Sequence, residues 1–122
     1  MSLDPEALVK RYLDTVVNGT AEDVAALYAD DATLEDPVGG GEVHIGRTAI
    51  AGFYGATANA QVETELLQLR VGGHEAAFVF AITVTMGETK VRIEPIEVMN
   101  FNGSGEITSM KAYWGPADIN QI

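Results

Sequence analysis

The sequence predicts an α+β fold in which three N-terminal helices pack on one face of a curved antiparallel sheet. Apolar residues recur at helical spacing over most of the first 56 residues, and alternate with polar residues from residue 62 onward. Short glycine-bearing breaks separate the alternating segments, as is typical of strands joined in hairpins. With 122 residues, 47% of them hydrophobic, we expect one domain over residues 1–122 that buries a single core.

Three helices are expected in the N-terminal part. The first begins at Asp4-Pro5, a capping acid followed by proline at the first helical position, and ends at Gly19. A capping-box pattern of Thr20 and Asp23 predicts the second, and the third covers residues 47–56. The apolar faces predicted for the first two helices consist of Leu8, Val9, Tyr12, Leu13 and Val16, and of Val24, Leu27 and Tyr28.

Five strands are expected. A short one over residues 32–36 ends at Pro37 and a run of three glycines. Four longer ones follow, over residues 62–71, 76–85, 90–101 and 106–114. Because helices come first and hairpin-linked strands follow, the sheet is predicted to carry the helices on one face and to enclose a cavity suited to a small apolar ligand.

Composition excludes several classes of function. The 18 acidic residues against 7 basic ones give a net charge of -11, which repels nucleic acid and anionic membranes, so neither is expected as a partner. The absence of cysteine excludes disulfides and thiolate chemistry, and no metal or cofactor motif is present, so we expect neither group. Without an apolar run of 18 residues or a signal-peptide pattern, a cytoplasmic protein is expected.

Three polar side chains fall on apolar faces. By strict alternation Glu97 shares a face with Val91, Ile93, Met99 and Phe101, although a bulge at Pro95 would shift that count. If the count holds, desolvation raises the pKa of Glu97, and a neutral carboxyl can donate a hydrogen bond.

Asp36 and Tyr12 are the other two polar side chains. Asp36 shares a face with Ala32 and Leu34, although aspartate before proline also commonly begins a turn. Tyr12, like Tyr28 and Tyr54, can equally be a core tyrosine whose hydroxyl finds some partner. His44 and His74 lie in turn-like or polar stretches and are expected in solvent.

Four stretches of the chain give it a family resemblance: ALYADDATLEDPVG (26–39), GRTAIAGFY (46–54), EAAFVF (75–80) and PIEVMNFNGSGEITSMKAYWG (95–115). In these the chain resembles the bacterial ketosteroid isomerases, steroid Δ5-isomerases of the nuclear transport factor two-like superfamily. The resemblance implies a cone-shaped sheet, or cystatin-like α+β barrel, and a homodimer formed through the sheet. It also implies a cofactor-free conversion of Δ5-3-ketosteroids to Δ4-3-ketosteroids through a dienolate.

The resemblance also implies roles for single residues. Asp36 is placed as general base, Tyr12 as a hydrogen-bond donor to the enolate oxygen, and Tyr28 and Tyr54 as supporting tyrosines. Glu97 falls where the family has the aspartic acid that completes the oxyanion hole. The expected pocket walls, for each of which ordinary core is an equal alternative, are Phe80, Met99, Met110 and Trp114.

Two other readings stay open. One is a related enzyme on the same fold, either a polyketide cyclase or an epoxide hydrolase; the latter needs an arginine between two aspartates, and by alternation Arg92 faces away from Glu97. The other is a protein that binds a hydrophobic ligand, or only dimerises, without catalysis.

Overall fold

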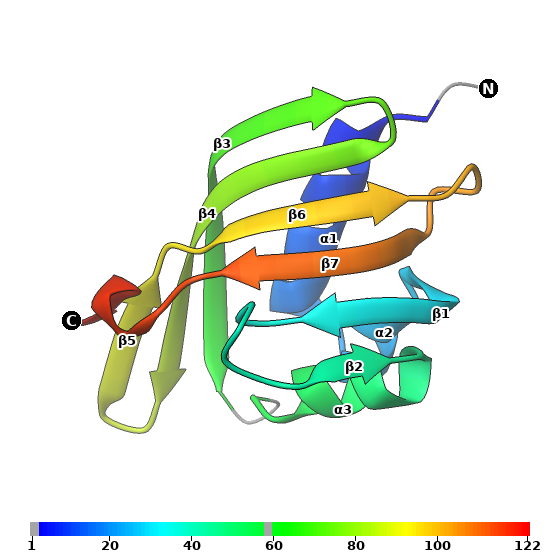
Figure 1. The fold of residues 1–122 in the computed structure, drawn as a ribbon. Coiled ribbons are helices and arrows are strands. Elements are labelled where there is room, and N and C mark those ends of the chain that lie inside the picture. Colours follow the sequence, from blue (N-terminus) through cyan, green and yellow to red (C-terminus); the bar gives the residue numbers. More distant parts are fainter. Residues whose placement is uncertain (1–2, 58–59) are drawn as a thin grey trace.

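The computed structural model describes residues 3–57 and 60–122, and in these the sheet and helices form an α+β fold (Figure 1). The helices are α1 (Pro5–Asn18), α2 (Ala21–Ala25) and α3 (Arg47–Gly55), with a short 3₁₀ helix, η1 (Pro116–Asp118). The strands are β1 (Tyr28–Glu35), β2 (Val43–Ile45), β3 (Gln61–Gly72), β4 (Glu75–Met86), β5 (Thr89–Ile93), β6 (Ile96–Phe101), β7 (Ile107–Tyr113) and β8 (Ile119–Gln121).

The sheet is curved, as expected, but it is mixed rather than wholly antiparallel. Its strand order is β2-β1-β7-β6-β4-β5-β8, β3 pairs along the other edge of β4, and β1 runs parallel to β7. The prediction of an antiparallel sheet was wrong at this one pairing. It failed because the two strands are joined by most of the chain rather than by a hairpin, so no local signal marks their pairing.

The helices cover one face of the sheet, and β3 and β4 bend so that the sheet curves around α1 (Figure 1). Asp4 caps α1 by accepting from the backbone N–H of Ala7, and the predicted stripe of α1 is buried at Val9, Tyr12 and Leu13. The capping box of α2 forms as predicted, from Thr20 and Asp23. No helix within the described residues is long and apolar enough to cross a membrane.

The second helix is shorter than predicted. It ends at Ala25, and the chain then enters the sheet, where the carbonyl of Leu27 accepts from the N–H of Ile107 at 3.0 Å. Tyr28, expected on a helix, is therefore the first residue of β1, and it is fully buried. The short strands β2 and β8 were not predicted, because each has three residues and no alternating pattern long enough to detect.

The strand predicted over residues 90–101 is two strands, β5 and β6, separated at Glu94-Pro95. Proline has no N–H to donate to the sheet, which explains the break. The register against β4 nevertheless continues unchanged: Ile93 pairs with Ile82 and Ile96 with Val79, so the paired numbers sum to 175 on both sides. The alternation count across Pro95 was therefore correct.

Candidate active site

A cavity of about 1640 Å³ lies between the three helices and the concave face of the sheet. Ligand pockets usually measure about 300–1000 Å³, so this one can hold a rigid polycyclic molecule. Residues of α1, α2, α3 and β4 make up most of its wall, and most of these side chains are apolar. Of the predicted site residues, those that line it are Tyr12, Asp36, Tyr54, Phe80, Glu97 and Trp114.

Glu97 is the buried acid of the cavity. It lies on the inward face of β6 between its cross-strand neighbours Phe78 and Ala112, and only 3% of it is exposed. Its Oε1 has no hydrogen-bond partner within the described residues. Burial raises the pKa of Glu97 well above its ordinary value, and the nearby charge of Asp36 raises it further. Burial therefore favours the neutral carboxyl, which is the form that can donate a hydrogen bond.

Asp36 is the second acid, and its surroundings differ. It follows the last residue of β1, and the indole N–H of Trp114 donates to its Oδ1 at 2.6 Å. The parallel pairing of β1 and β7 explains this contact, since it brings the carboxyl ends of both strands to the same edge of the sheet. Burial raises the pKa of Asp36, whereas the Trp114 hydrogen bond and the charge of His44 lower it.

Three tyrosines form a hydrogen-bonded chain through their hydroxyls. The Tyr54 hydroxyl lies 2.9 Å from that of Tyr12 and 2.7 Å from that of Tyr28. The pKa of each phenol is raised well above its ordinary value, chiefly by burial, so all three are neutral donors. Tyr12 and Tyr54 line the cavity, whereas Tyr28 lies behind Tyr54 in the core.

The structure corrects three expectations about the wall. Met99 and Met110 form a cross-strand pair that is almost wholly buried, and they belong to the core rather than to the cavity lining. His44, expected in solvent, is half-buried; it lines the cavity and packs against Phe53 with ring centroids 5.2 Å apart. Its position on the short strand β2, which the sequence did not reveal, explains why this residue was missed.

Comparison with known proteins decides the family. The model of the SnoaL-like domain matches residues 9–110 of the chain. The protein belongs to the SnoaL-like family. A steroid Delta-isomerase of Nocardioides simplex is 52% identical over 119 residues, which cover 98% of this chain and 96% of that protein. This degree of identity over nearly the whole of both chains supports isomerase activity.

Two solved structures have the same fold. The epoxide hydrolase/cyclase-like enzyme SalBIII, described in connection with pyran ring formation in polyether salinomycin, is 29% identical with a TM-score of 0.88, over 96% of this chain and 95% of that one. The RV0760c protein of Mycobacterium tuberculosis matches with a TM-score of 0.90 over 100% of this chain and 99% of that one, at 19% identity, which shows the fold alone.

Proposed function

We propose that the protein is a steroid Δ5-isomerase that converts Δ5-3-ketosteroids to Δ4-3-ketosteroids by intramolecular proton transfer. One observation carries the proposal: Asp36 and Glu97 line the same largely apolar cavity, and burial raises the pKa of both, but only Asp36 has a hydrogen bond from Trp114 that opposes the rise. The division of labour between an ionised base and a neutral acid is the one established for ketosteroid isomerases. The 52% identity with a steroid Delta-isomerase supports the steroid as substrate.

In the proposed reaction, ionised Asp36 removes a proton from the carbon between the ketone and the double bond. Trp114 occupies Oδ1, so Oδ2 is the oxygen that takes the proton. The electrons of the broken C–H bond move into a dienolate whose negative charge lies on the ketone oxygen. Tyr12 and neutral Glu97 donate to that oxygen, and these bonds strengthen as the charge develops. Protonated Asp36 then returns the proton two carbons along, which gives the conjugated ketone.

The decisive experiment follows the ultraviolet absorbance of the conjugated enone after a Δ5-3-ketoandrostene is added. The wild type is expected to turn over, and Asp36→Asn to lose about 10²–10⁴ of the rate, the usual contribution of a positioned base. Asp31→Asn is the matched control, since Asp31 is exposed and does not line the cavity. Turnover that survives in Asp36→Asn would remove Asp36 from the base role; binding of the steroid without turnover in any variant would favour a non-catalytic protein.

Epoxide hydrolysis is the less favoured alternative. The likeness to an epoxide hydrolase/cyclase-like enzyme supports this alternative, but within the described residues no arginine of the cavity wall forms an ion pair with an acid of that wall. Arg92 pairs with Glu94 outside the cavity. Arg47 does reach the wall, but its acidic partners Asp30 and Glu106 do not.

We also propose a homodimer formed through the outer face of the sheet. Ile96 and Tyr113 are cross-strand neighbours on that face, and about half of each remains exposed at 48% and 46%. Leu67 and Val71 of β3 are exposed as well. Burying such large apolar side chains against a second copy would stabilise the pair. Sedimentation equilibrium tests it, and a monomer at micromolar concentration would contradict it.

A further inference from the structure

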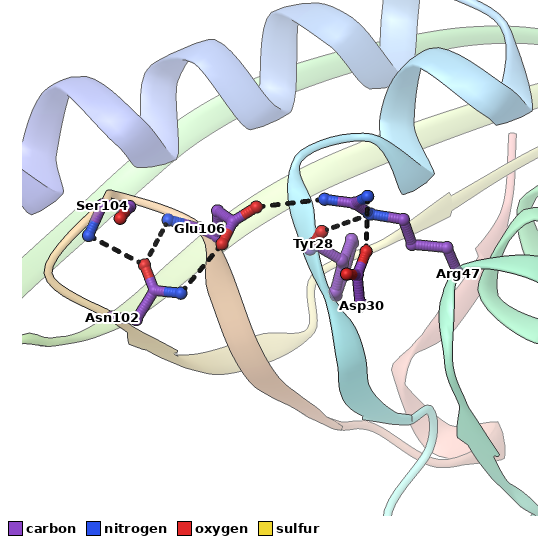
Figure 2. A network of polar contacts seen from close by, with 6 residues as sticks. All are labelled: Tyr28, Asp30, Arg47, Asn102, Ser104 and Glu106. Carbon is purple, nitrogen blue, oxygen red and sulfur yellow. Dashed lines mark hydrogen bonds and ion pairs between the residues drawn. The ribbon is translucent and has the colours of Figure 1, made fainter.

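Arg47, the first residue of α3, binds three acceptors on two other elements (Figure 2). Its Nε donates to the carbonyl oxygen of Tyr28 at 2.7 Å, one terminal nitrogen lies 2.7 Å from the carboxylate of Asp30, and the other donates to Glu106 at 3.0 Å. The planar guanidinium thereby joins the start of α3 to the start of β1 and to the end of the turn between β6 and β7.

The turn between β6 and β7 holds Glu106 in place for this contact (Figure 2). The side-chain oxygen of Asn102 accepts from the backbone N–H groups of Ser104 and Glu106, both at 3.0 Å. The side-chain nitrogen of Asn102 then donates to Oε1 of Glu106 at 3.0 Å, while Oε2 faces Arg47. The carboxylate is therefore fixed by its own turn, independently of the arginine.

Helix α3 has few other polar restraints at this end. Gly46 occupies the capping position and offers no side chain to the free N–H groups, and the first turn carries no acid. The only fully buried residue of the helix is Ile50. Two sets of polar contacts hold the start of α3 in place. One is the hydrogen bond from the N–H of Gly46 to the carbonyl of Ala32 at 2.9 Å, and the other is the set of contacts made by Arg47.

The other end of α3 carries Tyr54, the central member of the hydroxyl chain. Arg47 and Tyr54 are seven residues apart, which is about two helical turns and places them on the same side of the helix. Tyr28 is consequently bound twice by α3: Arg47 binds its carbonyl oxygen, and Tyr54 binds its hydroxyl. A shift of α3 along β1 would disturb both contacts and, through Tyr54, the hydroxyl of Tyr12.

We propose that Arg47 is a positioning residue that sets the placement of Tyr54 and thereby the hydrogen bonding of Tyr12, the proposed donor to the enolate oxygen. This role rests on the proposed function. The ion pairs themselves add little stability, because the Asp30 side chain is 89% exposed and such pairs are weakened by solvent. Catalysis depends on geometry much more steeply, since a displacement of about 1 Å can cost about a hundredfold in rate.

The proposal is tested with Arg47→Met, which keeps the apolar stem of the side chain and removes its N–H groups. We expect kcat to fall about tenfold and KM to stay within about twofold, because the substrate still fits while the donor is displaced. In a Tyr54→Phe background the same change should cost less than about twofold, since the link is already broken. Equal losses in both backgrounds would overturn the proposal.

Two further variants separate positioning from simple support of the fold. Arg47→Lys keeps the charge but cannot form the three bonds of the guanidinium, so an intermediate kcat is expected. Arg92→Met is the matched control, because Arg92 pairs only with Glu94 within the described residues and lies outside the cavity. It should leave kcat unchanged. The melting temperature of Arg47→Met should fall by less than about 8 °C.

A readout without substrate separates this proposal from the proposed function. The hydroxyl protons of the tyrosine chain are hydrogen-bonded to one another, and proton NMR can assign them by their change in Tyr54→Phe. Arg47→Met should shift or broaden these signals, and Arg92→Met should not. Unchanged signals would refute the positioning role even if the enzyme isomerises steroids; shifted signals in a protein without turnover would support it and reject the proposed function. Should Arg47→Met not fold, Glu106→Gln weakens the same contact and should shift the same signals.

Discussion

Replacing Glu97 by leucine is expected to stabilise the fold and to remove most of the proposed activity. The side chain is 3% exposed, its Oε1 has no partner within the described residues, and its cross-strand neighbours Phe78 and Ala112 are apolar. An apolar side chain of similar size therefore suits this position better than a carboxyl. The enzyme would retain the acid only because a ligand oxygen provides its missing partner.

The magnitude follows from the cost of the unpaired group. A buried polar atom without a partner costs about 1–3 kcal/mol, so Glu97→Leu should raise the free energy of unfolding by about that amount. In a chain of this length the melting temperature should rise by about 4–12 °C. Loss of one donor to the enolate oxygen should lower kcat by about 10²–10³.

The gain in stability should depend on pH. In the unfolded chain Glu97 loses its proton near the ordinary pKa of 4.5, whereas the folded protein keeps that proton because its pKa is raised. Between those two pKa values the unfolded state binds fewer protons, so the wild type loses about 1.4 kcal/mol of stability per pH unit as the pH rises. Glu97→Leu has no such loss, and its advantage over the wild type should therefore grow with pH above 4.5.

Urea unfolding at several pH values above 4.5 measures both effects. The fluorescence of Trp114, the only tryptophan of the sequence, reports the transition, and the denaturation midpoint gives the stability change if the slope is constant. Glu97→Gln is the matched control: it has no ionisable proton but still donates, so it should lose the part of the pH dependence that Glu97 contributes and keep more activity than Glu97→Leu. A Glu97→Leu protein that is less stable than the wild type and has the same pH dependence would show that the Glu97 carboxyl is not a destabilising, unpaired group.

Three further changes test other parts of the site. Trp114→Phe removes the 2.6 Å hydrogen bond that lowers the pKa of Asp36, so the acidic limb of the kcat/KM profile should move to higher pH; an unmoved limb would mean that another group titrates there. Tyr54→Phe should lower kcat by less than the about 10²–10³ of a direct donor, and urea unfolding should show a loss of about 1–3 kcal/mol because buried hydroxyls lose a partner. Met110→Ala should cost about 2–5 kcal/mol of stability by leaving a cavity in the core, while KM for the steroid, measured in the same absorbance assay, changes little; a large rise in KM would return Met110 to the pocket wall.

Local signals in the sequence were sufficient to predict where two of the helices begin and which face of the sheet carries Glu97. Asp4 and the Thr20–Asp23 pair cap helices as their residue types predict, because capping involves only neighbours in the chain. Alternation placed Glu97 on the inward face, and the unchanged register across Pro95 preserved that count. Alternation along a strand determines which residues share a face of the sheet, and this does not depend on the rest of the fold.

Contacts between distant segments could not be predicted in this way. Asp36 and Trp114 are 78 residues apart and meet only because β1 and β7 run parallel, a pairing that leaves no local pattern. Alternation also fails to say how deep a residue lies: Met99 shares the inward face with Glu97, but it lies in the part of that face that is filled by core. The depth depends on how the helices pack, which no single strand encodes.

The surroundings that affect the pKa values of the two carboxyls differ because of this tertiary arrangement. Asp36 keeps a hydrogen bond from Trp114 and the charge of His44 nearby, whereas Glu97 has neither, and the charge of Asp36 itself raises the pKa of Glu97. Burial chiefly, and the charge of the proposed base in addition, thus favour the protonated form of the proposed acid. In the proposed reaction, the negative charge of Asp36 disappears when it takes the substrate's proton, and a negative charge develops on the enolate oxygen beside Glu97 and Tyr12. The total charge of the cavity would then stay constant, so the proposed step moves one charge within a largely apolar space and does not require a second charge to be desolvated.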